Sequence, residues 1–383
     1  MENAAIAAGP LTRRAIPSLD GLRAISIAIV VLSHTKTLLP AALVNSGLFR
    51  YVIGGGLHGV QIFFVISGYL ITTLCLREFD RTGHISLARF YLRRALRIFP
   101  PFYLYLGVVA LLWAAAIQPQ DISTFISAAT YTLIYHPHPQ GWLVQHAWSL
   151  SIEEQFYLLW PVALLVTLRR NPALRLSALL LVIMPVARIA VLTIFQAHSA
   201  DHNRAIVNSS AIDMLMVGCL LALLGSKSEW RDRSARWSTR RSAQWISGSA
   251  TASAAITGLL LVPYANAKLA TTPFANAVEA LGYTITALSI GAILQYVVTE
   301  PQSIAGRILN LSLLRHLGII SYSIYLWQQL FTMPTIKFGL FTYPLILAAA
   351  ELSFWLVERP LHRLRARFER TSPVNPKAQS QPA

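Results

Sequence analysis

Cysteine and charged residues are both scarce in this sequence. The two cysteines, Cys75 and Cys219, lie alone inside apolar runs, a pattern that argues against a disulfide framework and a cysteine metal site. Charged residues make up 13% of the chain, whereas a soluble domain has about 25%. Metal-ligand spacings and internal repeats are also missing. The missing repeat weakens a transporter interpretation, because many transporters are built from repeated halves.

Hydrophobic residues, in contrast, make up 55% of the chain, and apolar runs long enough to cross a bilayer recur along its whole length. Backbone polar groups in hydrocarbon have to be satisfied internally, so such runs form helices. The sequence therefore predicts an all-α fold, a polytopic transmembrane bundle over residues 1–371, followed by a disordered polar tail over 372–383. We predict about ten spans, near residues 21–38, 57–76, 98–117, 148–168, 174–196, 209–225, 244–263, 279–298, 316–334 and 342–358.

Basic residues outnumber acidic ones, 32 to 16, which gives a formal net charge of +16. In a soluble protein this excess would suggest nucleic acid as a partner. Here lysine and arginine cluster in alternate loops, as the positive-inside rule requires, so we expect contacts with membrane lipids, no nucleic acid, and both termini in the cytoplasm. The loops assigned to the outside contain few cations, namely Lys36, Arg50, Arg204, Lys268 and Lys337.

Ionisable residues inside the predicted spans are candidates for function, because a charge in hydrocarbon is costly. A helix rise of about 1.5 Å per residue places five polar side chains in the outer part of the bilayer: His34, Glu153, Arg188, Asp213 and Gln328. If their helix faces converge, they line one wet cavity. Taken singly, His34 could lie at the interface, and Arg188 and Asp213 could be a buried pair that only fixes helix packing.

Other polar residues in the spans have structural interpretations. Glu154 fits the S-x-x-E capping box that starts at Ser151, so we assign it to a helix N-terminus. Ser67 and Gly68 in "FFVISGYLIT" predict a close helix contact, since small residues let helix backbones approach in membranes. A nucleophilic Ser67 is the less favoured alternative.

An arginine stripe in "ARFYLRRALRIFPPFY" enters the third predicted span. Arg93 and Arg97 share a helix face at i, i+4, with Arg89 one turn earlier. Planar guanidinium groups suit phosphate. The stripe therefore predicts a phosphate site at the inner surface, with binding of lipid headgroups as the alternative.

Five motifs together resemble a known family: "LDGLRAISIAIVVLSH" (19–34), "GVQIFFVISGYLIT" (59–72), "RRALRIFPPFY" (93–103), "WSLSIEEQFYLLWP" (148–161) and "SYSIYLWQ" (321–328). Over about residues 15–365, the chain resembles the acyltransferase-3 group of membrane acyltransferases, the relatives of bacterial O-antigen and exopolysaccharide O-acetylases. The resemblance implies a multi-pass protein of the bacterial inner membrane. It also implies transfer of an acyl group, commonly acetyl, from acyl-CoA to a hydroxyl of a surface carbohydrate or glycolipid. No metal is expected, because the sequence has no metal-ligand spacing.

The resemblance also assigns roles to particular residues. The family's pairing of a basic residue with a histidine eleven positions later falls on Arg23 and His34. Its R-x-x-x-R motif falls on Arg93 and Arg97, and its acidic position falls on Glu153. The chain departs from the pattern of many relatives at three positions, which we assign to acceptor choice or helix pairing: Gln61, Ala211 and Gln328.

An alcohol needs a base to attack a thioester at neutral pH, and histidine titrates in the right range. We predict that His34 removes the acceptor's hydroxyl proton and that Glu153 orients His34. Arg23, Arg93 and Arg97 are assigned to acyl-CoA. The acceptor site is assigned to Arg188, Asp213, Gln328 and Tyr157. A covalent acyl-His34 intermediate remains open, as do a secondary transporter, a glycan flippase and a membrane scaffold.

Overall fold

The computed structural model describes residues 17–54, 56–167, 172–195, 200–226, 241–269, 274–333, 338–361 and 363. Within these ranges all regular secondary structure is helical, which confirms the predicted all-α class. Several predicted features lie outside the described residues: the tail at 372–383, both chain ends, and the basic segments at 169–170 and 227–240.

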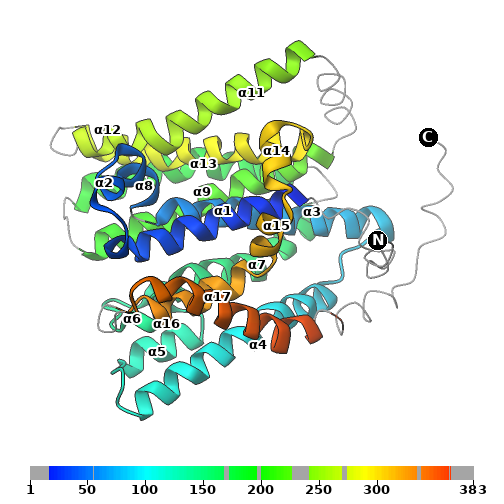
Figure 1. Ribbon diagram of the computed structural model, residues 1–383. Helices are drawn as coiled ribbons and strands as arrows, with labels where there is room; N and C mark the ends of the chain where they lie inside the picture. The colour runs from blue at the N-terminus through cyan, green and yellow to red at the C-terminus, as the bar shows by residue number, and fades with distance from the viewer. Residues whose placement is uncertain are drawn as a thin grey trace, which may run out of the picture.

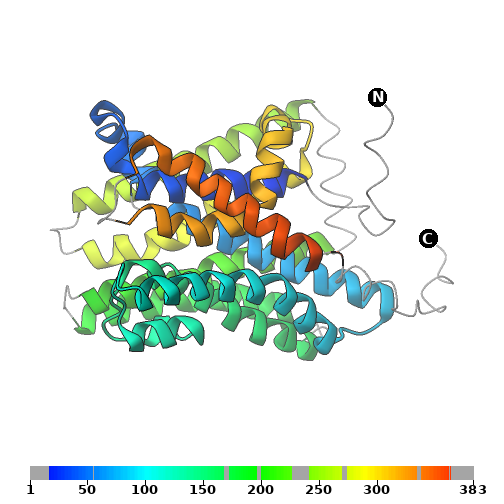
Figure 2. The ribbon, with the colours of Figure 1, turned by 60° about the horizontal axis from the view of Figure 1, so that its bottom comes forward.

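Long helices form the body of the protein and run side by side (Figures 1 and 2). They are α1 (Pro17–His34), α3 (Leu57–Thr82), α4 (Leu87–Ala114), α7 (Ala147–Thr167), α8 (Pro172–Phe195), α9 (Ala200–Ser226), α11 (Arg241–Ile256), α13 (Ala275–Thr299) and α17 (Thr342–Ser353). The shorter helices are α2 (Ala41–Val44), α5 (Ile122–Ala129), α6 (Trp142–Gln145), α12 (Val262–Leu269), α14 (Ile304–Leu309), α15 (Ser312–Ile319) and α16 (Ser321–Phe331). Brief 3-10 or π-helical turns lie at Lys36–Leu38, Phe49–Ile53, Leu133–Tyr135, Thr257–Leu261, Gly339–Phe341 and Phe354–Glu358.

Five helices among the described residues are long and apolar enough to cross a membrane: Leu57–Thr82, Leu87–Ala114, Gly248–Asn266, Ala275–Thr299 and Gly339–Leu361. They fall on predicted spans and support the multi-pass membrane protein that the sequence predicts. Helices α1, α7, α8 and α9 fall on further predicted spans, and these four carry most of the polar residues singled out above.

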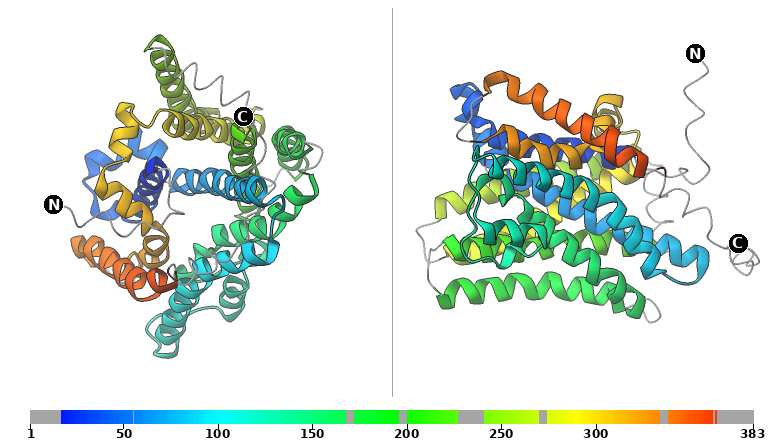
Figure 3. Two further views of the ribbon diagram at one scale, coloured as in Figure 1. Left: turned by 90° about the vertical axis from the view of Figure 1, so that its right-hand side faces the viewer. Right: turned by 90° about the horizontal axis from the view of Figure 1, so that it is seen from below.

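Helix α3 lies toward the middle of the bundle, where it packs against α1, α7, α9 and α13 (Figure 3). Two glycines let α3 and α9 approach. A Cβ on Gly68 would lie 2.1 Å from the carbonyl oxygen of Leu215, and a Cβ on Gly218 would lie 2.2 Å from that of Val65. Neither position has room for a side chain, so the close contact predicted from Gly68 is confirmed.

We expect Gly68→Ala to lower the stability of the folded protein by about 1–3 kcal/mol, because the added methyl group would force α3 and α9 apart. Gly107→Ala in α4 is the matched control, since a Cβ there meets nothing within 4 Å. Thermal unfolding in detergent compares the two variants. Equal melting temperatures for both would show that the α3–α9 contact is not tight.

Two predicted spans have different bounds in the structure. Helix α4 begins at Leu87 rather than near residue 98, because arginine is a good helix former and the stripe continues the helix. The span predicted at 316–334 is divided at Ile320 into α15 and α16. A Cβ on Gly318 would lie 1.8 Å from the carbonyl oxygen of Asp20, so α15 packs directly on α1 before the chain turns.

The segment between α4 and α7 contains the short helix α5. Helix α5 starts after Asp121, whose carboxylate caps it by accepting a hydrogen bond of 2.7 Å from the backbone N–H of Thr124. Hydrogen bonds from the Ser123 hydroxyl and from Thr124 lower the pKa of Asp121 to about 2. This carboxylate therefore remains charged at neutral pH and serves the helix.

Candidate active site

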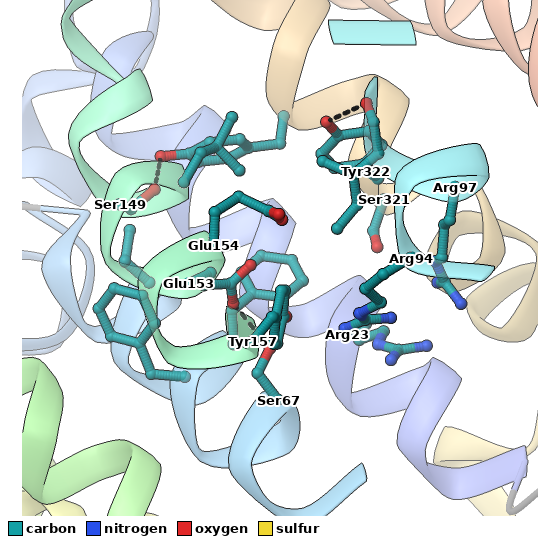
Figure 4. A pocket seen from close by; sticks show the side chains of 16 residues that line it. Arg23, Ser67, Arg94, Arg97, Ser149, Glu153, Glu154, Tyr157, Ser321 and Tyr322 are labelled. Atoms are coloured by element: carbon teal, nitrogen blue, oxygen red, sulfur yellow. Dashed lines mark hydrogen bonds between the residues drawn. The ribbon is translucent and has the colours of Figure 1, made fainter. Parts of the chain in front are cut away.

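A cavity between α1, α3, α4, α7 and α16, called here the arginine cavity, contains opposed charges. Figure 4 shows Arg23 from α1 and Arg94 and Arg97 from α4 on one side, facing Glu153 and Glu154 from α7. The other polar residues that line it are Ser67, Ser149, Tyr157, Ser321, Tyr322 and Tyr325. Three guanidinium groups against two carboxylates leave a formal excess of one positive charge, which suits an anionic ligand.

Glu153 belongs to a small hydrogen-bonded network in this cavity. The hydroxyl of Ser67 donates to Glu153 Oε1 at 2.7 Å, and the hydroxyl of Tyr157 donates to Ser67 Oγ at 3.0 Å. The guanidinium of Arg94 stacks over the Tyr157 ring, 4.0 Å from its centroid. Glu153, Tyr157 and Ser67 therefore form one unit beside the arginines. Tyr157, which the sequence assigned to the acceptor, lies with them.

The arginine stripe is divided between two environments. The guanidinium of Arg93 pairs with Glu78 at 2.8 Å and does not line the cavity. Arg94 takes its place, and the Arg94 Nε is buried without a hydrogen-bond partner among the described residues. Arg23 pairs with Asp20 at 3.1 Å and still lines the cavity. Residues at i, i+3 share a helix face just as residues at i, i+4 do. Arg94 and Arg97 were therefore as good a pair as Arg93 and Arg97, and the spacing alone could not choose between them.

A second cavity, called here the histidine cavity, lies where α1 ends. Its polar and aromatic lining consists of His34, Trp142, Gln145, His146, Trp148, Tyr325 and Gln329. The ring of His34 packs edge-on against Trp142, with centroids 5.5 Å apart. His146 is buried between the edges of Tyr105 and Tyr325. Trp142 and His146 are not predicted from the sequence, because the short helix α6 that positions them has no periodic signal.

A chain of amides fixes the proton on His34. The side-chain NH2 of Gln329 donates to the carbonyl oxygen of Trp142 at 2.8 Å, so its Oε1 is the acceptor for Gln328 Nε2 at 2.9 Å. The remaining oxygen of Gln328 then accepts from His34 Nδ1 at 2.8 Å. A carbonyl can only accept, and this sets the direction of the whole chain. The His34 proton therefore lies on Nδ1, and Nε2 carries the lone pair, with no hydrogen-bond partner among the described residues.

The expected contact between Glu153 and His34 is absent, because each of these side chains has a different partner. Gln328 orients His34, whereas Glu153 accepts from Ser67 in the arginine cavity. Gln328, which was expected to contact the acceptor, is therefore the hydrogen-bond partner of His34. Depth along a helix predicted that these residues lie at one level, but it does not set which way each helix face points.

Arg188 and Asp213 form a third, separate group. Arg188 pairs with Asp213 at 3.0 Å and donates to the backbone carbonyl of Ala280 at 2.6 Å, while Thr284 donates to the same carboxylate. Both charged side chains are at most 1% exposed and line neither cavity. The five helix faces do not converge on one cavity, because Glu153 lines the arginine cavity and His34 lines the histidine cavity. The alternative, a buried pair that ties α8, α9 and α13 together, is what the structure contains.

The capping role expected for Glu154 is also wrong. Helix α7 begins at Ala147, four residues before Ser151, and the Ser151 hydroxyl donates back to the carbonyl of Ala147 at 2.9 Å. Ser151 therefore lies inside the helix and caps nothing. Glu154 faces the arginine cavity instead.

The two cavities differ in the chemistry that they can perform. The arginine cavity can hold a phosphorylated group, and the histidine cavity offers an imidazole nitrogen that can accept a proton. Within the described part of the chain, no group of three or more His, Cys, Asp and Glu residues could hold a metal ion.

Known proteins with similar sequences include acetyltransferases. A family model described as "Acyltransferase domain" matches residues 16–357. The chain is 27% identical over 387 residues to the peptidoglycan O-acetyltransferase OatA of Listeria monocytogenes, across 92% of this chain and 56% of that protein. It is 30% identical over 227 residues to the O-acetyltransferase OatA of Staphylococcus aureus, across 55% of this chain and 35% of that protein. The chain thus spans little more than half the length of the first of these relatives. No solved structure matches it.

Proposed function

Because the chain belongs to the acyltransferase-3 family, we propose that it transfers an acyl group, in particular acetyl, from cytoplasmic acyl-CoA to a hydroxyl of a cell-envelope carbohydrate or glycolipid. The observation that carries this proposal is the pairing of the arginine cavity with a histidine whose Nε2 is free. The peptidoglycan O-acetyltransferase among the relatives supports a carbohydrate acceptor.

The donor's phosphates belong in the arginine cavity. Arg94 and Arg97 are one turn apart on α4, and Arg23 from α1 lies on the same side of the cavity (Figure 4). Guanidinium groups bind phosphate oxygens in pairs, and they remain charged at every physiological pH. Arg23 and His34 are separated by eleven residues of α1, or roughly 16 Å of helix rise, so an extended thioester arm has to connect the two cavities.

The acceptor belongs in the histidine cavity. Trp142 and Trp148 supply aromatic faces of the kind that pack on the apolar faces of sugar rings, and Gln145 supplies amide groups for hydroxyls. His34 projects into the same space. An acceptor hydroxyl placed there lies within reach of the base without entering the arginine cavity.

The proposed reaction needs one base and balances without a metal. His34 Nε2 takes the hydroxyl proton as the acceptor oxygen forms a bond to the thioester carbon. The carbon–sulfur bond then breaks, and the CoA sulfur takes the proton from the His34 imidazolium and leaves as a thiol. Gln328 holds the ring in the tautomer that this step requires. We place Glu153, with Ser67 and Tyr157, beside the donor arm rather than on His34.

A purified preparation tests the function directly. We expect the protein in lipid vesicles to move radiolabelled acetyl from acetyl-CoA onto an oxygen of a glycan or glycolipid acceptor, as read by mass spectrometry and by alkaline release of acetate. Movement of glycolipid across the vesicle membrane without any acetyl transfer would identify a flippase instead. Acetyl exchange between CoA molecules in the absence of acceptor would favour the acyl-His34 intermediate over direct transfer.

We further propose about ten spans in the bacterial inner membrane with both termini cytoplasmic, because this arrangement places the arginine cavity inside and His34 outside. A cysteine at the exposed Asn45, between α1 and α3, should then react with an impermeant thiol reagent added to intact spheroplasts. Cys75 and Cys219 are buried, so the unmodified protein serves as the blank. Labelling of Asn45→Cys only after membrane disruption would invert the topology.

A further inference from the structure

The arginine cavity and the histidine cavity meet at a common wall. Tyr325 and Val60 are the two residues that line both of them. Tyr325 comes from α16 and is 7% exposed, and Val60 comes from α3 and is 8% exposed. Neither Arg94 nor Arg97 lines the histidine cavity, and His34 does not line the arginine cavity. The wall therefore separates the groups that the proposed reaction has to bring together.

Hydrogen bonds fix the Tyr325 ring in this wall. Its hydroxyl donates to the backbone carbonyl of His146 at 2.9 Å and lies 2.6 Å from Ser149 Oγ, which is its second partner. The ring contacts His146 and Phe63 edge-on, with centroids 5.4 and 6.4 Å away. A ring held at its hydroxyl and along its edges cannot yield freely to a bulky group.

We propose that Tyr325 and Val60 form the aperture through which the acyl group reaches His34, and that they set the length of acyl chain the protein transfers. This inference rests on the proposed function. The sulfur arrives from the arginine cavity and the acceptor oxygen from the histidine cavity, and both bond to the same carbon, so the thioester carbonyl has to stand in the aperture, within reach of His34, during transfer. A short acyl group fits beside a fixed ring, whereas each added methylene has to displace it.

The experiment compares acetyl-CoA with butyryl-CoA as donor for the wild type, Tyr325→Ala and Val60→Ala, in vesicles with a fixed acceptor. One methylene changes discrimination by about 10–200-fold in an apolar site. We therefore expect the wild type to prefer acetyl. We expect each widening variant to raise the butyryl-to-acetyl ratio of kcat/KM by about tenfold or more.

Leu294→Ala is the matched control. Leu294 is a fully buried large side chain on α13 that lines neither cavity, so its loss should destabilise the protein without changing the ratio. If Tyr325→Ala is folded but transfers neither donor, Val60→Ala decides, because it keeps the tyrosine and its hydrogen bonds.

Two results would overturn the inference while leaving the proposed function intact. One is a wild type that transfers acetyl and butyryl equally well. The other is an unchanged ratio in an active Val60→Ala protein. Failure of the wild type to transfer any acyl group from acyl-CoA would instead refute the proposed function, and the two failures are therefore distinguishable.

Discussion

Replacing His34 by alanine is expected to lower kcat for acyl transfer by about 10²–10⁴-fold, the usual contribution of a general base. The substitution removes the group that takes the acceptor proton in the proposed step, while the amide chain from Gln328 to Trp142 stays intact. The measurement is acetyl transfer by purified protein at saturating acetyl-CoA. The affinity for CoA, measured without acceptor, should be unchanged, because the arginines lie in the arginine cavity and His34 does not.

His316→Ala is the matched control for this prediction. His316 lies on α15, pairs with Glu351 at the surface and lines neither cavity. It should retain wild-type kcat. A His34→Ala protein that folds, inserts and still transfers acetyl at the wild-type rate would remove His34 from the chemistry.

Replacing Arg94 by alanine is expected to raise the KM for acyl-CoA by about 10–100-fold with a smaller change in kcat, since a hydrogen bond to a charged group contributes about 1.5–3 kcal/mol. The proposal assigns Arg94 to a donor phosphate, and its Nε has no other hydrogen-bond partner among the described residues. Initial rates over a range of acetyl-CoA concentrations separate the two kinetic constants.

Arg93→Ala tests the same charge one position earlier on the helix. Because Arg93 pairs with Glu78 outside the cavity, its loss should lower stability and leave the KM for acyl-CoA within a few-fold of the wild type. If Arg93→Ala has the larger effect on KM, the donor phosphates lie outside the arginine cavity and the assignment of Arg94 is wrong.

The sequence alone predicts much of this fold, because apolar length and loop charge are local properties. Helical class, the recurring spans and the close approach at Gly68 all follow from residue types read in order. The first residue of α4 could not be predicted from apolar length and loop charge. Its arginines show where hydrocarbon ends, whereas the helix itself continues past them to Leu87.

The candidate site was predictable in its residues but not in their grouping. His34, Glu153, Arg23 and Arg97 all line one of the two cavities. The partners of His34 and Glu153 depend on how each helix is rotated about its own axis, which tertiary packing decides and spacing does not. The same limit explains why Glu154 and Arg94 were passed over in favour of Ser151 capping and Arg93.

The wall formed by Tyr325 and Val60 has a consequence for the cell as a whole. A path for ions through a membrane enzyme would dissipate the transmembrane potential. Each elementary charge that crosses a potential of 100 mV dissipates about 2.3 kcal/mol. Tyr325 and Val60 are buried and line both cavities, so the proposed aperture between them would limit the passage of ions. In the proposed reaction the acyl group passes the wall in one direction and the acceptor's proton passes it in the other, so that a turnover transfers no net charge.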